Sequence, residues 1–122
     1  MPRPVHFEIP VDNPERAIEF YSTIFGWKFS KWGGPMEYWL ITTGEPAEPG
    51  INGGLLRRGD PNQPCVNTIT VASVDDSLQA IAKGGGVCVL PKMVVPGIGW
   101  MAYCKDPDGH IFGIMQPDAA AA

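Results

Sequence analysis

Two residues that could perform acid–base chemistry lie two positions apart near the start of the chain. His6 and Glu8 alternate with Val5, Phe7 and Ile9, and this alternation is typical of a strand with one aliphatic and one polar face. His6 and Glu8 therefore share a face, where Glu8 could orient or charge-stabilise His6. Residues two apart on a strand are better placed to share a ligand than to bond each other. We expect them to be the catalytic or ligand-contacting pair.

A helix after this strand helps to position the pair. Asp12 or Asn13 supplies a side-chain oxygen for the first free N–H groups, and Pro14 suits the first helical position. Gly26 can end the helix in the left-handed conformation. Five apolar residues follow helical spacing and predict a face that packs on the aliphatic side of the strand: Ala17, Phe20, Tyr21, Ile24 and Phe25. The polar strand face is then left for solvent, a partner chain or a cavity.

The chain repeats this plan once. Residues 4–58 and 65–117 each read as a strand, a helix and three further strands, and a Pro- and Gly-rich linker over residues 59–64 joins them. The repeat predicts two βαβββ modules that pair to bury what neither buries alone. Gly53-Gly54 predicts a bulge or a close backbone approach. Residues 118–122 carry no core signal, and we expect a disordered tail there.

The composition of the chain argues against nucleic-acid binding and against a membrane span. A chain of 122 residues has single-domain length, and its net charge of −4 without a long basic run argues against nucleic acid. No apolar run is long enough to span a membrane. Three cysteines, Cys65, Cys88 and Cys104, have no paired short spacing, and no apolar N-terminal segment is present. We expect a cytoplasmic protein with reduced thiols that act as small apolar fillers.

Aromatic and methionine side chains are more numerous than so small a core hides. They predict a core, a dimer interface or the wall of a small-molecule pocket. Ile111 and Met115 share a strand face with Gly113, which leaves an apolar gap suited to an organic ligand. The residues that we expect to contact a ligand are Trp39, Asn52, Met101, Tyr103, Gly113 and Met115.

Three strings resemble the vicinal oxygen chelate superfamily, the group of glyoxalase I, bleomycin-resistance proteins, fosfomycin-resistance enzymes and extradiol dioxygenases. They are HFEIPVDNPERAIEFYSTIFGW at 6–27, VDDSLQAIAKGGG at 74–86 and DPDGHIFGIMQ at 106–116. The resemblance covers nearly the whole chain. It implies one α+β domain over residues 3–117, in which two βαβββ modules form curved mixed sheets around a central cavity, commonly completed by a second chain.

The resemblance also implies where a divalent metal would bind, with one ligand on the first strand and one near the end strand of each module. Such a metal chelates two neighbouring substrate oxygens. His6 fills one position, whereas the others fall near Gly53, Val66 and Gly113, which cannot coordinate. A divalent ion needs at least three protein ligands, and His110 follows a tight turn, where an exposed or capping histidine is expected. We predict no cofactor, with zinc, nickel, manganese or iron at His6 as the alternative.

The sequence therefore predicts a glyoxalase- and bleomycin-resistance-like protein of unassigned substrate. We expect it to bind a small organic molecule in a largely metal-independent cavity, as a homodimer without nucleic acid or membrane partners. One alternative is a divalent-metal-dependent lyase, isomerase or dioxygenase that uses His6. Another is a non-catalytic ligand-sensing or interaction module.

Overall fold

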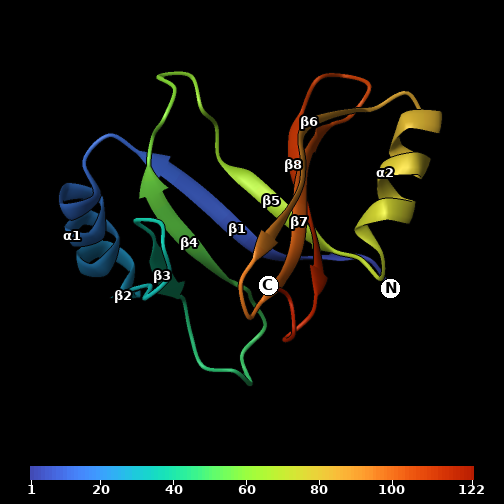
Figure 1. The fold of residues 1–122 in the computed structure, drawn as a ribbon. Coiled ribbons are helices and arrows are strands. Elements are labelled where there is room, and N and C mark those ends of the chain that lie inside the picture. Colours follow the sequence, from blue (N-terminus) through green and yellow to red (C-terminus); the bar gives the residue numbers. More distant parts are fainter. The chain divides into compact units, whose positions relative to one another are not determined.

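The computed structural model describes residues 1–122, and its helices and strands follow the order strand, helix and three strands, twice over (Figure 1). The chain divides into two compact units. We call His6–Cys65 the first unit, and Val66–Ala122 together with Met1–Val5 the second unit. The predicted α+β fold with two βαβββ modules is confirmed.

The first unit carries its strands in the order β2-β3-β4-β1. Its elements are the His6–Val11 part of β1 (Arg3–Val11), α1 (Pro14–Phe25), β2 (Lys28–Lys31), β3 (Trp39–Thr42) and β4 (Asn52–Arg57). β1 pairs parallel with β4, whereas the β4–β3 and β3–β2 pairs are antiparallel. Asn13 is the cap of α1, because its side chain accepts a hydrogen bond from the Arg16 N–H, and Gly26 ends the helix at φ 73°.

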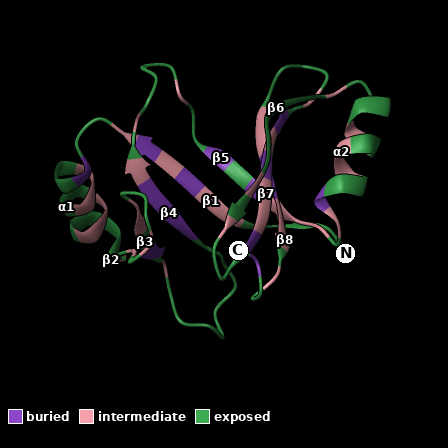
Figure 2. Cartoon of the chain, viewed as in Figure 1, coloured by how far each residue is buried: buried purple, intermediate pink, exposed green.

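Only part of the apolar face of α1 packs on the sheet. Tyr21 stacks on Trp27, with ring centroids 5.1 Å apart and planes 6° from parallel. Phe20, Ile24 and Phe25 remain more than half exposed, and much of α1 is coloured as exposed in Figure 2. The prediction that all five apolar residues pack on the aliphatic side of the strand was therefore wrong for these three. Tyr21 is connected to β1 through Trp27, whose ring centroid lies 5.8 Å from that of Phe7.

The second unit carries its strands in the order β5-β8-β7-β6. Its elements are β5 (Val66–Thr70), α2 (Val74–Lys83), β6 (Val87–Val95), β7 (Gly99–Lys105) and β8 (Ile111–Pro117). β5 pairs parallel with β8, and the β8–β7 and β7–β6 pairs are antiparallel. Val74, Ala102 and Ile114 form the buried core, and partly buried apolar residues of α2 and the strands pack around them.

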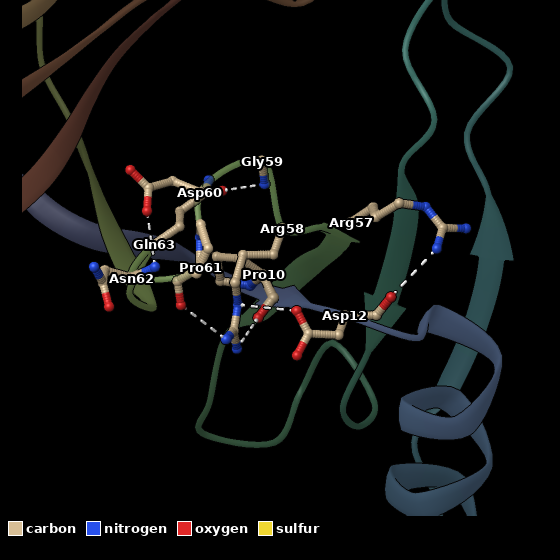
Figure 3. A network of polar contacts seen from close by, with 9 residues as sticks. All are labelled: Pro10, Asp12, Arg57, Arg58, Gly59, Asp60, Pro61, Asn62 and Gln63. Carbon is tan, nitrogen blue, oxygen red and sulfur yellow. Dashed lines mark hydrogen bonds and ion pairs between the residues drawn. The ribbon is translucent and has the colours of Figure 1, made fainter.

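The segment after β4 is held against the first unit by Arg58 (Figure 3). The Arg58 guanidinium donates to the backbone carbonyl of Pro10 at 3.3 Å and to that of Pro61 at 3.2 Å. Its Nε lies 3.8 Å from a carboxylate oxygen of Asp12. Two side chains close turns within the linker, with Gln63 accepting from the Gly59 N–H and Asp60 from the Asn62 N–H.

The last residues of the chain also make contacts. The Gly97 N–H donates to the Ala121 carbonyl at 2.9 Å, and the Trp100 indole N–H donates to Asp118 at 3.1 Å. Disorder of residues 118–122 stays a prediction about the chain in solution. No helix of the structure is long and apolar enough to cross a membrane.

Candidate functional site

A buried carboxylate lies on one face of the first unit's sheet. In the β1–β4 register, Glu8 lies opposite Gly54 and His6 lies opposite Asn52, so these four residues share a face. Glu8 is only 9% exposed, and His6 is half-buried. The prediction that His6 and Glu8 point the same way is confirmed by the strand geometry, and the Glu8 side chain does not face open solvent.

Tyr38 joins the two predicted residues. Its Oη lies 2.7 Å from His6 Nε2, and its O–H donates to Glu8 Oε2 at 3.0 Å. The Tyr38 and His6 rings lie 14° from parallel. Tyr38 lies just before β3, at the end of the loop that follows β2, and no sequence pattern links it to β1. We call His6, Tyr38 and Glu8 the His-Tyr-Glu chain.

Gly54 makes room for this chain. A Cβ atom at position 54 would overlap the ring and hydroxyl of Tyr38. Gly53 makes room for Phe7 on the opposite face of the sheet, because a Cβ atom at position 53 would collide with that residue. The β1–β4 register runs through both glycines without a shift. Of the two predicted explanations for Gly53-Gly54, the close approach is therefore confirmed and the bulge is wrong.

The hydrogen-bond directions fix the protons of the His-Tyr-Glu chain. Because the Tyr38 O–H donates to Glu8, its Oη accepts from a proton on His6 Nε2. A neutral His6 then carries its lone pair on Nδ1. Burial lowers the pKa of His6 below its ordinary value of 6.5, and the charge of Glu8 opposes that shift with a smaller effect. His6 is thus neutral at pH 7, with Nδ1 as a basic nitrogen.

The structure does not bring every predicted ligand residue of the first unit to this chain. Trp39 lies opposite Leu55, whereas the neighbouring β3 position lies opposite Gly54, so Trp39 belongs to the other sheet face. Asn52 lies on the same face as the His-Tyr-Glu chain, but its Oδ1 accepts from the N–H and hydroxyl of Thr43. Ligand contact by Trp39 and Asn52 stays a prediction.

The four predicted ligand residues of the second unit share one face of its sheet. Met101 pairs with Met115, and Tyr103 pairs with Gly113. Thr68, which sequence reasoning missed, lies opposite Gly113 on β5. Thr68 is 3% exposed, and its Oγ1 has no hydrogen-bond partner. A Cβ atom at position 113 would stand 3.1 Å from that oxygen, so the glycine leaves space beside a buried hydroxyl.

The residues within each unit do not fit a divalent metal of the expected kind. No group of three or more His, Cys, Asp or Glu side chains gathers in either unit. Gly53 and Gly113 have no side chain, and Val66 is a buried aliphatic residue. His110 is exposed, and its Nδ1 lies 3.2 Å from Asp106 Oδ2. A three-ligand ion therefore has no complete donor set within a unit.

A family model described as bleomycin resistance protein-like N-terminal matches residues 3–44. The chain is also 27% identical over 120 residues to CFP32, a protein named as a glyoxylase, from Mycobacterium tuberculosis and from Mycobacterium bovis. That alignment covers 89% of this chain and 43% of the relative. The chain therefore spans less than half the length of these curated relatives.

Solved structures share the fold at low sequence identity. Methylmalonyl-CoA epimerase from Mycobacterium tuberculosis matches with a TM-score of 0.71 and 14% identity, over 94% of this chain and 87% of that one. Protein BH1468 from Bacillus halodurans matches with a TM-score of 0.73 and 14% identity, over 99% and 98% of the two chains. The Streptomyces coelicolor epimerase with 2-nitronate-propionyl-CoA matches at 0.70 with 13% identity, over 98% and 97%.

Proposed function

We propose that the chain is a member of the vicinal oxygen chelate superfamily and that it binds a small organic molecule without a metal ion. The proposal rests on the His-Tyr-Glu chain, in which Tyr38 lies hydrogen-bonded between His6 and Glu8. The hydroxyl of Tyr38 fills the space of a β4 side chain at position 54. A metal at His6 and Glu8 would first have to displace that hydroxyl.

The same hydrogen bonds suggest the chemical class of the ligand. His6 Nδ1 is a basic nitrogen that can accept a proton or a hydrogen bond, so it suits a ligand with an acidic O–H, N–H or activated C–H group. The Trp32 ring lies edge-on to Tyr38, 6.2 Å between centroids, and favours an apolar or aromatic ligand body. The net charge of −4 favours a neutral or singly charged molecule over a polyanion.

An acid–base enzyme is the second candidate, and the proton order along the His-Tyr-Glu chain favours it. If His6 Nδ1 accepts a proton from the ligand, its Nε2 proton can pass to Tyr38 and the Tyr38 proton to Glu8. The positive charge on the imidazole is thereby removed, and Glu8 ends protonated. Relatives named as a glyoxylase and structural neighbours named as an epimerase are consistent with proton chemistry of this kind.

We propose that the chain forms a homodimer, so that its protein partner is a second copy of itself. The exposed apolar residues of α1, Phe20, Ile24 and Phe25, are side chains that a second copy could cover. Light scattering on the purified chain should give twice the chain mass, and Phe25→Glu should return the mass of one chain. A cytoplasmic location stays a prediction from the cysteines.

Ligand binding is tested by screening neutral and singly charged aromatic acids, phenols and short-chain carboxylic acids by thermal shift and protein NMR. Tyr38→Phe removes only the tyrosine hydroxyl of the His-Tyr-Glu chain, and we expect it to lower the affinity for any bound ligand at least fivefold. Tyr21→Phe is the matched control, because it makes the same chemical change beside Trp27. We expect no change in affinity from that control.

Metal titration separates the alternatives. Stoichiometric binding of zinc, nickel, manganese or iron that His6→Ala abolishes would contradict the metal-free proposal and favour the metal-dependent lyase, isomerase or dioxygenase. Failure of every small molecule and every metal to bind would favour the ligand-sensing or interaction module. Equal loss of affinity in Tyr38→Phe and Tyr21→Phe would remove the His-Tyr-Glu chain as the binding group.

A further inference from the structure

Two cysteines of the second unit lie directly opposite each other on neighbouring strands. In the antiparallel β6–β7 pair, Cys88 on β6 is in register with Cys104 on β7. The two thiols also influence each other, because Cys88 raises the pKa of Cys104, and the Cys88 thiol donates to the Leu90 carbonyl at 3.4 Å. Directly opposed residues in an antiparallel pair have Cα atoms about 4.5–5.5 Å apart, within the roughly 4.4–6.8 Å that a disulfide spans.

The two thiols differ in access to solvent. Cys88 is exposed on β6, the edge strand of this sheet, whereas Cys104 is fully buried. The β6–β7 register shifts between Cys88 and Leu90, so regular pairing ends beside the cysteine pair and the edge strand can adjust there. The prediction that the cysteines are small apolar fillers agrees with the buried Cys104 and is wrong for Cys65 and Cys88, which are exposed.

We propose that Cys88 and Cys104 form a reversible intramolecular disulfide when the chain meets a peroxide. The Cys88 thiolate attacks one peroxide oxygen, and the O–O bond breaks. The other oxygen takes up a proton and departs as water, and Cys88 becomes a sulfenic acid. The Cys104 sulfur then attacks the Cys88 sulfur, the S–O bond breaks, and a second water leaves as the S–S bond forms. The two thiols lose two electrons and two protons, and one peroxide becomes two waters.

The electrostatics set the order of these steps. Burial, and then the neighbouring Cys88 thiol, raise the pKa of Cys104 to about 11. Cys104 is therefore a protonated thiol at neutral pH, and the thiolate is the reactive form of cysteine. Oxidation begins at the exposed Cys88, and Cys104 acts as the resolving thiol. A reagent that alkylates Cys88 first should block the disulfide.

The sequence allows a direct test on the full chain by peptide mapping. Trypsin cleavage after Arg58, Lys83, Lys92 and Lys105 places each cysteine on its own peptide, residues 59–83, 84–92 and 93–105. After hydrogen peroxide treatment and alkylation without reductant, we expect peptides 84–92 and 93–105 to be joined by one disulfide. The count of free thiols should fall from three to one, and dithiothreitol should restore it.

Variants separate this disulfide from other products. Cys65→Ser should leave the linked peptides and their rate of formation unchanged. Cys88→Ser should abolish them while the protein keeps its fold by circular dichroism, and Cys104→Ala provides the same test should one variant fail to fold. A disulfide only between Cys65 residues of two chains would overturn the proposal. So would oxidation of Cys88 to sulfinic acid with Cys104 still a free thiol.

Discussion

Replacement of Gly54 by alanine tests the packing that holds the His-Tyr-Glu chain. A Cβ atom at this position would occupy the space of the Tyr38 hydroxyl and of its ring carbons. Because the β4 backbone is fixed by pairing with β1 and β3, the tyrosine must move. It then loses its contacts to His6 Nε2 and Glu8 Oε2.

The expected cost follows from these two hydrogen bonds. A neutral hydrogen bond contributes about 1 kcal/mol, and one to a charged carboxylate about 2 kcal/mol. Alanine recovers about 0.5–1 kcal/mol because it loses less chain entropy than glycine in a strand. Gly54→Ala should therefore lower the free energy of unfolding by about 2–2.5 kcal/mol. In a Tyr38→Ala background no ring is present, and the same change should stabilise the protein slightly.

The assay is urea unfolding followed by tryptophan fluorescence, on both single variants and the double variant. We expect a coupling energy of about 3 kcal/mol between positions 54 and 38. Gly33→Ala is the matched control, because a Cβ atom there meets nothing within 4 Å, and it should change stability by less than about 0.5 kcal/mol. If Gly54→Ala costs the same with and without the Tyr38 ring, the reasoning is refuted.

Three further predictions concern His6, Thr68 and Arg58. Because burial lowers the pKa of His6, the unfolded chain binds a proton before the folded chain does as pH falls through 6.5. The free energy of unfolding should therefore keep its full value above that pH and decline below it. In His6→Gln, the urea midpoint should vary less between about pH 5 and 7.5 than it does in the parent chain. Thr68→Val removes a buried hydroxyl without a partner and should stabilise the chain by about 1 kcal/mol in calorimetry, whereas a loss would reveal a hydrogen bond to that oxygen. Arg58→Lys cannot keep both bonds to the carbonyls of Pro10 and Pro61 and should cost about 1–2 kcal/mol in urea unfolding; an unchanged midpoint would show that these bonds contribute nothing.

Local rules were sufficient to predict most of the fold. The N-cap oxygen, Pro14 and Gly26 set the bounds of α1 at Pro14–Phe25, and Ser73 caps α2 in the same way. β6 is longer than the Val87–Leu90 run suggests and continues through Pro91 to Val95. It can do so because an edge strand tolerates a proline that donates no hydrogen bond.

The candidate site was predicted only in part. His6 and Glu8 follow from strand alternation, which is a local property of the chain. Tyr38 reaches them from a loop 30 residues away from Glu8 in sequence, and no periodic pattern encodes such a contact. Thr68 was missed because a threonine in a strand is ordinary, and only its register with Gly113 reveals the unpaired hydroxyl. The Gly53-Gly54 pair was the one sequence signal that pointed to Tyr38.

The uneven distribution of tryptophan gives each repeat its own optical signal. Trp27, Trp32 and Trp39 lie in the first unit, whereas Trp100 is alone in the second. A variant that retains only Trp100, whose indole is bonded to Asp118, would report the melting of the second repeat by itself. Coincident melting of both signals would mean that the two repeats form one cooperative unit, and separate transitions would mean that each half unfolds independently.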